Sequence, residues 1–292
     1  SGKSSLISET LKPLLENKIN NCDNLVGQYS DISGYESIDK VIDVSQDPIG
    51  RTPRSNPATY VGLFDKIRRV FAKTDYAVSH NMDADFFSFN STKGRCPYCE
   101  GQGQIKVEMH FMPDVWIKCD ECHGRRFRNE VLENKINGKN ISDILEMDVN
   151  EAADFFKDHK DIYAVLQIMQ EVGLGYIKLG QNATTLSGGE AQRVKIAKEL
   201  CRKTKGRALY ILDEPTTGLH FNDIKLLLKL FKRLIKDGHT IIVIEHNKNI
   251  IRCADWIVDI GPEGGNDGGR LLVEGPISAV KKCNESITAE YV

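Results

Sequence analysis

The stretch Leu186-Ser187-Gly188-Gly189-Glu190-Ala191-Gln192-Arg193, followed closely by Ala208-Leu209-Tyr210-Ile211-Leu212-Asp213-Glu214-Pro215, decides the fold of this chain. The apolar run from Ala208 to Leu212 predicts a strand that is buried on both faces of a parallel sheet. Ligands of open α/β sheets bind at the carboxyl ends of the strands, so Asp213 and Glu214 are expected beside a phosphate and its Mg²⁺. Because neighbours on a strand point opposite ways, one carboxylate should face the metal and the other the attacking water.

A helix is predicted to begin directly after Ser187. Ser187 and Glu190 have the spacing of a capping box, and apolar residues recur along the following turns. Gly188 and Gly189 would leave backbone N–H groups accessible at the positive end of this helix, which makes an anion site. An ordinary capped helix beside a core strand would explain the capping box alone. The complete string and the strand ending in Asp-Glu-Pro favour a phosphate site.

These motifs resemble a known family. Residues 187–193 and 212–215 are similar to the signature and Walker B segments of ABC-type ATPases. Residues 216–220, Thr-Thr-Gly-Leu-His, resemble more closely the C-terminal half of the UvrA family, the damage-recognition ATPases of bacterial nucleotide excision repair. The resemblance implies an α/β fold with an ABC-type P-loop ATPase core.

The first residues match the end of a phosphate-binding loop. Gly2, Lys3, Ser4 and Ser5 fit the last part of G-x-x-x-x-G-K-[ST], so Lys3 would reach the β/γ-phosphates and Ser4 would bind Mg²⁺. The tripeptide Gly2-Lys3-Ser4 alone is weak evidence for such a loop, but the carboxylates of Asp213 and Glu214 strengthen the prediction. We expect that the sequence begins inside its own nucleotide site.

The resemblance assigns further roles in ATP hydrolysis. Asp213 and Gln46, which follows the strand expected at 40–44, would attend the Mg²⁺, and Glu214 would polarise the water. His246, at the end of the strand expected at 240–244, would sense the γ-phosphate. The Ser187-Gly188-Gly189 segment would clamp a nucleotide held by a different ATPase unit.

Four cysteines have the spacing of a structural zinc site. Cys96 and Cys99 form one C-x₂-C pair, and Cys119 and Cys122 form another after nineteen residues. Four thiolates close a tetrahedron around Zn²⁺, so this metal would be structural rather than catalytic. Redox pairs or free thiols are the alternative. The glycines after the first pair also resemble the zinc repeats of DnaJ co-chaperones.

Basic residues gather before the zinc motif. Residues 48–60 resemble the UvrA family, and the segment 51–73 carries six basic residues against one acidic residue. A helix with the apolar face Tyr60, Phe64, Ile67 and Phe71 is expected here. The basic groups either form a solvated face or contact DNA phosphates, which position a protein without reading sequence; we favour DNA contact. The residues expected on DNA are Arg51, Arg54, Lys66 and Arg69, and Arg125, Arg126 and Arg128 could add contacts.

Composition limits the remaining possibilities. The chain has 292 residues, is 40% hydrophobic and carries a net charge of −2, so charge alone indicates no nucleic acid. No apolar run approaches the ~18 residues of a membrane span, and no signal peptide is recognised. The cysteine spacing favours a reducing compartment, the cytoplasm. Other expected elements are loop and hairpin strands over 17–37, a hairpin at Asn137-Gly138, helices near 150–158, 161–172 and 221–236, and strands over 255–276 joined by a glycine-rich turn at 264–269.

The domain division follows from the long separation in sequence between the two phosphate-facing motifs, which begin at Gly2 and Ser187. We expect an ATPase core from residues 1–50 and 181–292, and an inserted DNA-binding domain over 51–180 with a zinc module at 90–128. The resemblance implies ATP hydrolysis coupled to recognition of damaged double-stranded DNA, delivery of the lesion to the partner UvrB, and a homodimer. The alternatives are another ABC-type ATPase or UvrA paralogue outside repair, and a DnaJ-like zinc module without nucleotide affinity.

Overall fold

The chain folds into two compact units. A computed structural model describes residues 2–109, 115–202, 206–261 and 268–292. Unit 1 comprises Ser1–Ser45 and Thr204–Val292, and unit 2 comprises Gln46–Lys203. The helix that follows the Ser-Gly-Gly motif lies in unit 2, where it packs on two of that unit's helices, α2 and α8. The boundary between the two compact units therefore comes after this helix.

A parallel sheet forms the centre of unit 1. Its strands β1 (Lys40–Val44), β4 (Ala208–Asp213) and β5 (Thr240–Ile244) lie in the order β1-β4-β5. The register sets Val44 opposite Leu212 and Asp213 opposite Ile244. Residues 208–212 are buried, as the apolar run predicts. Among the described strands β5 is an edge, and most of it is half-buried.

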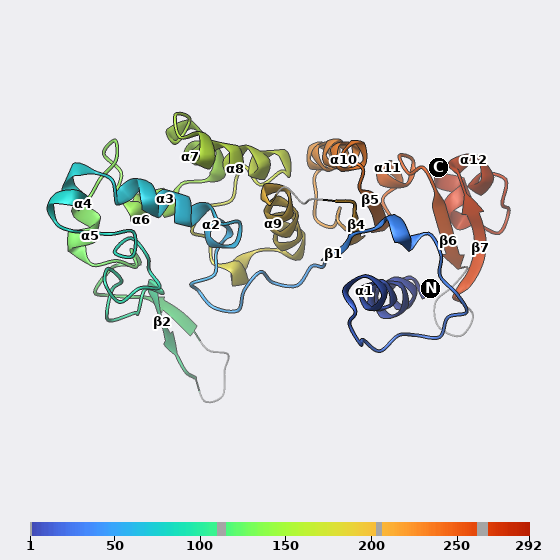
Figure 1. The fold of residues 1–292 in the computed structure, drawn as a ribbon, viewed down its shortest axis with the longest axis horizontal. Helices are drawn as coiled ribbons and strands as arrows, with labels where there is room; N and C mark the ends of the chain where they lie inside the picture. Colours follow the sequence, from blue (N-terminus) through green and yellow to red (C-terminus); the bar gives the residue numbers. More distant parts are fainter. Residues whose placement is uncertain (1, 110–114, 203–205, 262–267) are drawn as a thin grey trace. The chain divides into compact units, whose positions relative to one another are not determined.

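Helices cover both faces of this sheet. Figure 1 shows α1 and α10 on opposite sides of it, and Leu15 of α1 packs against Leu209 and Ile211 of β4. In α10 the buried side chains include Leu230, whereas Leu228 is half-buried. The helices of unit 1 are η1 (Ser5–Leu11, a π-helix), α1 (Lys12–Asn20), η2 (Tyr35–Ser37), α10 (Phe221–Lys236), α11 (Lys248–Ile251), α12 (Ile277–Val280) and η5 (Ile287–Tyr291).

Two other segments of unit 1 were expected to contain strands. The antiparallel pair β6 (Ile257–Gly261) and β7 (Arg270–Gly275) confirms the strands expected within 255–276. The glycine-rich turn between them falls mostly outside the described residues. No strand forms within 17–37, since α1 continues to Asn20 and the chain then runs as loop to η2. Two Asn17–Asn24 hydrogen bonds of 2.8 and 2.9 Å fix that loop on α1 instead.

Unit 2 is mainly helical. The expected apolar face over 60–71 is divided between two helices, because Gly62 adopts a φ of 77° and ends the first. Phe64, Ile67 and Phe71 are buried as predicted. Asn137 and Gly138 both have positive φ in a bridge-closed turn, as expected for a tight hairpin. The helices are α2 (Pro57–Tyr60), α3 (Leu63–Phe71), α4 (Asp75–Ser79), α5 (Asn129–Glu133), α6 (Ile141–Glu146), α7 (Val149–Phe155), α8 (Lys160–Glu171), η3 (Ala183–Thr185) and α9 (Gly188–Cys201).

One small ribbon extends from unit 2. Strands β2 (Gln104–Val107) and β3 (Val115–Lys118) pair antiparallel directly beside the cysteine pairs, and β2 is seen projecting in Figure 1. An isolated two-stranded hairpin is marginally stable in water, so this one depends on its base. There Ile105 packs on the four cysteines. Among the described residues, none of the helices combines the length and apolarity needed to cross a bilayer.

Candidate nucleotide and zinc sites

Carboxylates crowd the carboxyl end of the sheet in unit 1. Asp213 ends β4, Glu214 follows it, Glu245 follows β5, and Asp43 is the fourth residue of β1. Burial raises the pKa of Asp213, the charges of Glu214, Asp43 and Glu245 raise it further, and Lys3 lowers it. A concentration of negative charge at a partly buried carboxyl is relieved by a cation, and Mg²⁺ prefers such oxygen ligands. The surroundings of Asp213 therefore fit a ligand of a nucleotide-bound Mg²⁺.

The first helix brings a lysine to this edge. Lys3 is half-buried and close enough to Asp213 to act on its pKa. Gly2 has a φ of 80°, which glycine adopts without strain, and its carbonyl accepts from Leu6 N–H at 3.0 Å. Lys3 and Ser4 thus stand at the N-terminal end of η1, where N–H groups and a cation favour phosphate. Lys12 of α1 forms an ion pair with Asp43, so that carboxylate also has a partner within the protein.

Glu214 differs from the expectation drawn from strand geometry. The strand ends at Asp213, and Glu214 has a φ of 45°, in the left-handed region. The alternation of side chains along a strand therefore does not extend to Glu214. Left-handed backbone is costly for a non-glycine residue, and residues strained in this way cluster at functional sites. Here the Glu214 carboxylate lies 3.5 Å from His246 Nε2, so two of the residues given catalytic roles meet.

The Ser-Gly-Gly motif lies at the start of α9 in unit 2. The predicted capping box is present: Ser187 N–H donates to Glu190 Oε2 (2.8 Å), and Glu190 N–H donates to Ser187 Oγ (3.3 Å). The Tyr176 hydroxyl donates to Glu190 Oε1 (2.7 Å) and accepts from Arg193 (3.2 Å). A side chain at Gly188 would meet Gln46, because its Cβ would lie 3.0 Å from Gln46 Oε1. Gln46 is therefore a neighbour of the motif within unit 2.

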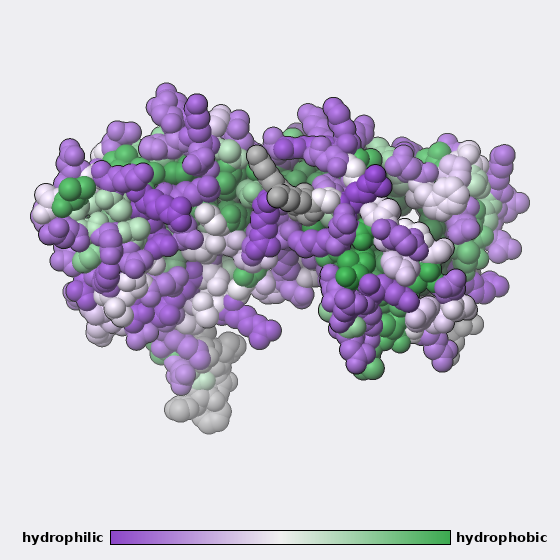
Figure 2. All heavy atoms as spheres, viewed as in Figure 1, coloured by the Kyte–Doolittle hydropathy of each residue, from purple (hydrophilic) through white to green (hydrophobic). Residues whose placement is uncertain are grey.

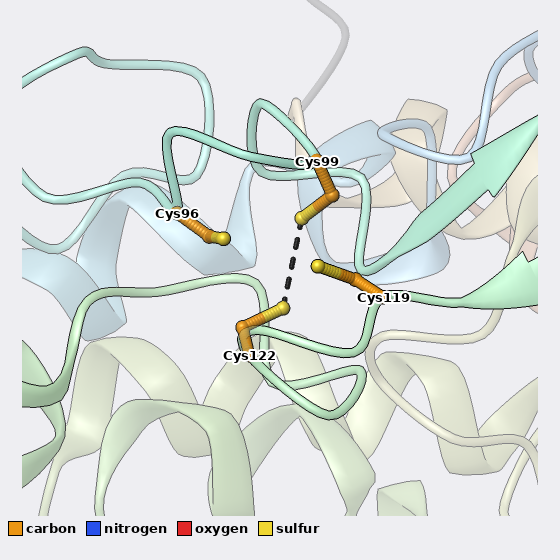
Figure 3. Close-up of side chains that lie close together, drawn as sticks. All are labelled: Cys96, Cys99, Cys119 and Cys122. Atoms are coloured by element: carbon orange, nitrogen blue, oxygen red, sulfur yellow. Dashed lines mark hydrogen bonds between the residues drawn. The ribbon is translucent and has the colours of Figure 1, made fainter.

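The four cysteines converge on one point, as Figure 3 shows. All four are buried, and their sulfur atoms lie within 4.8 Å of one another, with Cys99 and Cys122 at 3.6 Å. A tetrahedral Zn²⁺ with Zn–S bonds of ~2.3 Å requires sulfurs roughly 3.8 Å apart. The cluster therefore fits a four-thiolate zinc site without an open position. No pair among the eight cysteines forms a disulfide.

The backbone around the sulfurs is shaped for thiolates. Burial raises the pKa of Cys122 to about 12, so its thiolate needs a stabilising partner such as the metal. Burial also raises the pKa of Cys99. The Gly103 N–H donates a hydrogen bond to its sulfur at 3.2 Å and lowers that pKa, but the effect of burial is larger. Gly103 has a φ of 74°, and a Cβ there would lie 2.8 Å from the Gly124 carbonyl oxygen. The glycines of the motif are thus required by the two turns. His123 is exposed beside the cluster, and His110 lies outside the described residues.

The arginines after the second cysteine pair hold the module together. Arg126 donates to the carbonyls of Pro53 (3.0 Å) and Gly180 (3.1 Å), and its guanidinium lies 5.3 Å from the Phe89 ring centre. Arg128 donates to the carbonyls of Arg95 and Thr92. Arg125 donates to the Cys122 carbonyl at 3.3 Å. These intramolecular bonds account for Arg126, whereas Arg125 and Arg128 are exposed, and their contact with phosphate stays a prediction.

The residues expected to contact DNA differ in availability. Arg51 and Arg69 are exposed, and neither forms an ion pair within the described parts of the chain. Arg54 is half-buried and pairs with Glu100 at 3.1 Å. Lys66 is half-buried on α3. Neighbouring Arg68 is held by Asp65, Asp85 and the Ala84 carbonyl. Figure 2 shows hydrophilic residues over most of the visible face of unit 2.

Three residues of these sites were not anticipated. Asp43 interrupts an apolar strand, which is a sequence signal for a site at a sheet edge. Glu245 directly follows the apolar run of β5, like Asp213 and Glu214 in the segment of β4, and this parallel could have identified it. Tyr176 has no such signal, because its contact with Glu190 depends on how the loop before α9 folds.

Comparison with known proteins extends these findings. The ABC transporter family model matches residues 98–217. UvrABC system protein A of Aquifex aeolicus (strain VF5) is 53% identical over the whole chain, which covers 32% of that protein. The homologue from Staphylococcus aureus (strain COL) is 52% identical, with 31% of it covered.

A solved structure agrees with the sequence matches. The crystal structure of UvrA2 from Deinococcus radiodurans matches all of this chain with a TM-score of 0.91 and 46% identity, and 35% of that structure is covered. The chain spans about a third of the length of the curated relatives it matches. The fold is that of an ABC ATPase with a four-cysteine cluster consistent with a zinc-binding module. By sequence and fold, the chain is therefore similar over its whole length to the UvrA-type ABC ATPases, and it matches about one third of such a protein.

Proposed function

We propose that this chain is the ATPase segment of a DNA-damage-recognition protein of bacterial nucleotide excision repair, acting in the cytoplasm. The observation that carries the proposal is the 53% identity to UvrABC system protein A over all 292 residues. The carboxylate cluster at the end of β4 supplies the chemistry. The ATPase core would combine residues 1–50 and 181–292, and the insertion over 51–180 would bind DNA with its zinc module at 90–128.

ATP and Mg²⁺ would supply the phosphoryl group and its charge neutralisation, and the protein would position them. The phosphates would be held by the segment Gly2, Lys3, Ser4 and Ser5. Asp213 and Gln46 would attend the metal. Glu214 would polarise the attacking water, and His246 would sense the γ-phosphate. Ser187, Gly188 and Gly189 would clamp the nucleotide of a second ATPase unit, since positioning and charge stabilisation account for most of the catalysis in phosphoryl transfer.

The proposed partners are double-stranded damaged DNA, UvrB and a second copy of the full-length protein. Contact with DNA phosphates through Arg51, Arg54, Lys66 and Arg69 is supported by the exposure of Arg51 and Arg69. UvrB and the homodimer come from the resemblance to UvrA alone.

Replacing Arg69 with alanine in the full-length protein is expected to weaken duplex binding up to about tenfold at 0.1 M salt. A lost phosphate contact should also reduce the slope of log affinity against log salt by about one. Fluorescence anisotropy with one labelled duplex across a salt series measures both quantities. Lys232→Ala, which removes an exposed charge from α10, is the matched control. An unchanged slope for Arg69→Ala would remove this residue from the DNA surface.

A UvrA paralogue outside repair is the second candidate, because the matched crystal structure is of a protein named UvrA2. Such a protein would share the nucleotide and zinc chemistry. The same anisotropy assay with an undamaged duplex and one carrying a bulky adduct separates the two candidates. Equal affinity for both duplexes would favour the paralogue.

A further inference from the structure

Glu245 connects the two loops that carry the residues given catalytic roles in unit 1. It lies directly after β5, and its carboxylate accepts four hydrogen bonds. Oε1 accepts from Thr216 N–H (2.9 Å) and Thr216 Oγ1 (2.5 Å), in the loop after β4. Oε2 accepts from His246 N–H (2.8 Å) and Asn247 N–H (2.9 Å), in its own loop. One side chain thus fixes both loops relative to each other.

The two loops carry Glu214 and His246. Glu214 is two residues before Thr216, and His246 follows Glu245 directly. Their side chains meet at 3.5 Å although both are substantially exposed, with 45% and 66% of the side-chain surface accessible. An exposed pair of this kind contributes little energy of its own. Its geometry must therefore be held by the backbone, and a misplacement of 1 Å at reacting groups costs about 10²-fold in rate.

The hydrogen bonds also exclude another role for Glu245. An ionised carboxylate offers roughly four lone-pair positions. Two donors on each oxygen occupy all of them, so a cation would have to displace existing bonds. Glu245 raises the pKa of Asp213 through its charge, but its oxygens are committed to the loops.

We propose that Glu245 is a positioning residue that holds Glu214 and His246 in the arrangement needed for ATP turnover. The inference rests on the proposed ATPase function. A carboxylate suits this role because all four partners are donors and bonds to a charged acceptor are roughly twice as strong as neutral ones. Glutamine at this position would turn an NH₂ group toward two N–H or O–H donors, leaving one loop without its acceptor.

The test uses the full-length protein with three variants. Glu245→Gln should lower kcat for ATP by about tenfold or more, with KM and the Kd for Mg-ATP changed less than threefold. Thr216→Val keeps the charge of Glu245 and removes one donor, so a several-fold loss of kcat there shows that position rather than charge matters. Thr216→Ser retains the hydroxyl and should restore most of the rate. Glu274→Gln, at an exposed glutamate of β7, is the matched control.

The possible outcomes separate the proposed ATPase function from the positioning role of Glu245. A wild-type protein without ATPase activity would contradict the proposed function. A normal kcat in Glu245→Gln, in an active background, would overturn the positioning role alone. An equal loss of kcat and Mg-ATP affinity would show that Glu245 supports the nucleotide site generally, and would also overturn it. If Glu245→Gln fails to fold, identical kcat in Thr216→Val and Thr216→Ser would overturn the inference.

Discussion

The Glu214→Gln variant of the full-length protein is expected to bind ATP normally and to hydrolyse it roughly 10²- to 10⁴-fold more slowly, the range of general acid–base catalysis. Glutamine keeps the size of the side chain but cannot accept the proton of the attacking water. Glu214 is well placed for this task, because it follows the strand end at Asp213 and its backbone is left-handed at a φ of 45°. Its carboxylate also meets His246 at 3.5 Å.

Two measurements on Glu214→Gln separate chemistry from binding. Phosphate release under saturating ATP gives the turnover, and equilibrium titration with a fluorescent ATP analogue gives the affinity. Glu285→Gln, at an exposed glutamate of the same unit, controls for loss of one negative charge. Unchanged turnover would reject the role of Glu214. A parallel loss of affinity would mean that Glu214 holds the nucleotide rather than the water.

Replacing Cys119 with serine is expected to remove one equivalent of zinc and to unfold the module over 90–128. Cys119 is fully buried among the other three sulfurs, and the β2–β3 ribbon depends on this cluster through Ile105. Structural zinc contributes on the order of 10 kcal/mol to the folding of small metal modules, so the cysteine cluster alone should not keep the module folded. We expect new protease cleavage within the module.

The zinc prediction is checked by elemental analysis of the purified full-length protein against wild type. We predict that Cys119→Ser holds one equivalent of zinc per chain less than the wild-type protein, whatever the total zinc content of the wild type. Cys253→Ser changes an exposed cysteine of unit 1 and should leave both the zinc content and the protease pattern unchanged. Equal zinc in the Cys119→Ser and wild-type proteins would remove the four-thiolate site.

The parts of the fold that follow from local sequence were predictable. The apolar run of β4 and the capping box of α9 depend on neighbouring residues, and both were confirmed. The zinc cluster was also predictable, because the spacing of its cysteines is itself the geometric constraint.

The parts of the fold that depend on residues distant in sequence were harder to predict. The half-exposed state of β5 depends on its place at an edge, which the composition of one strand does not record. Arg126 looked like a phosphate ligand, yet it donates to the carbonyls of Pro53 and Gly180, 73 and 54 residues away in sequence. The left-handed backbone of Glu214 and the four bonds of Glu245 likewise arise only when the loops after β4 and β5 meet.

We propose that ATP turnover at the carboxylate edge of unit 1 is coupled to DNA bound by the insertion over residues 51–180. The most direct test is the steady-state ATPase rate of the full-length protein, measured while a damaged duplex is titrated at fixed salt. We expect a saturable change in kcat that is lost in Glu214→Gln and whose midpoint moves to higher DNA concentration in Arg69→Ala. An ATPase rate that is the same at every DNA concentration, in a protein that binds the duplex, would contradict it.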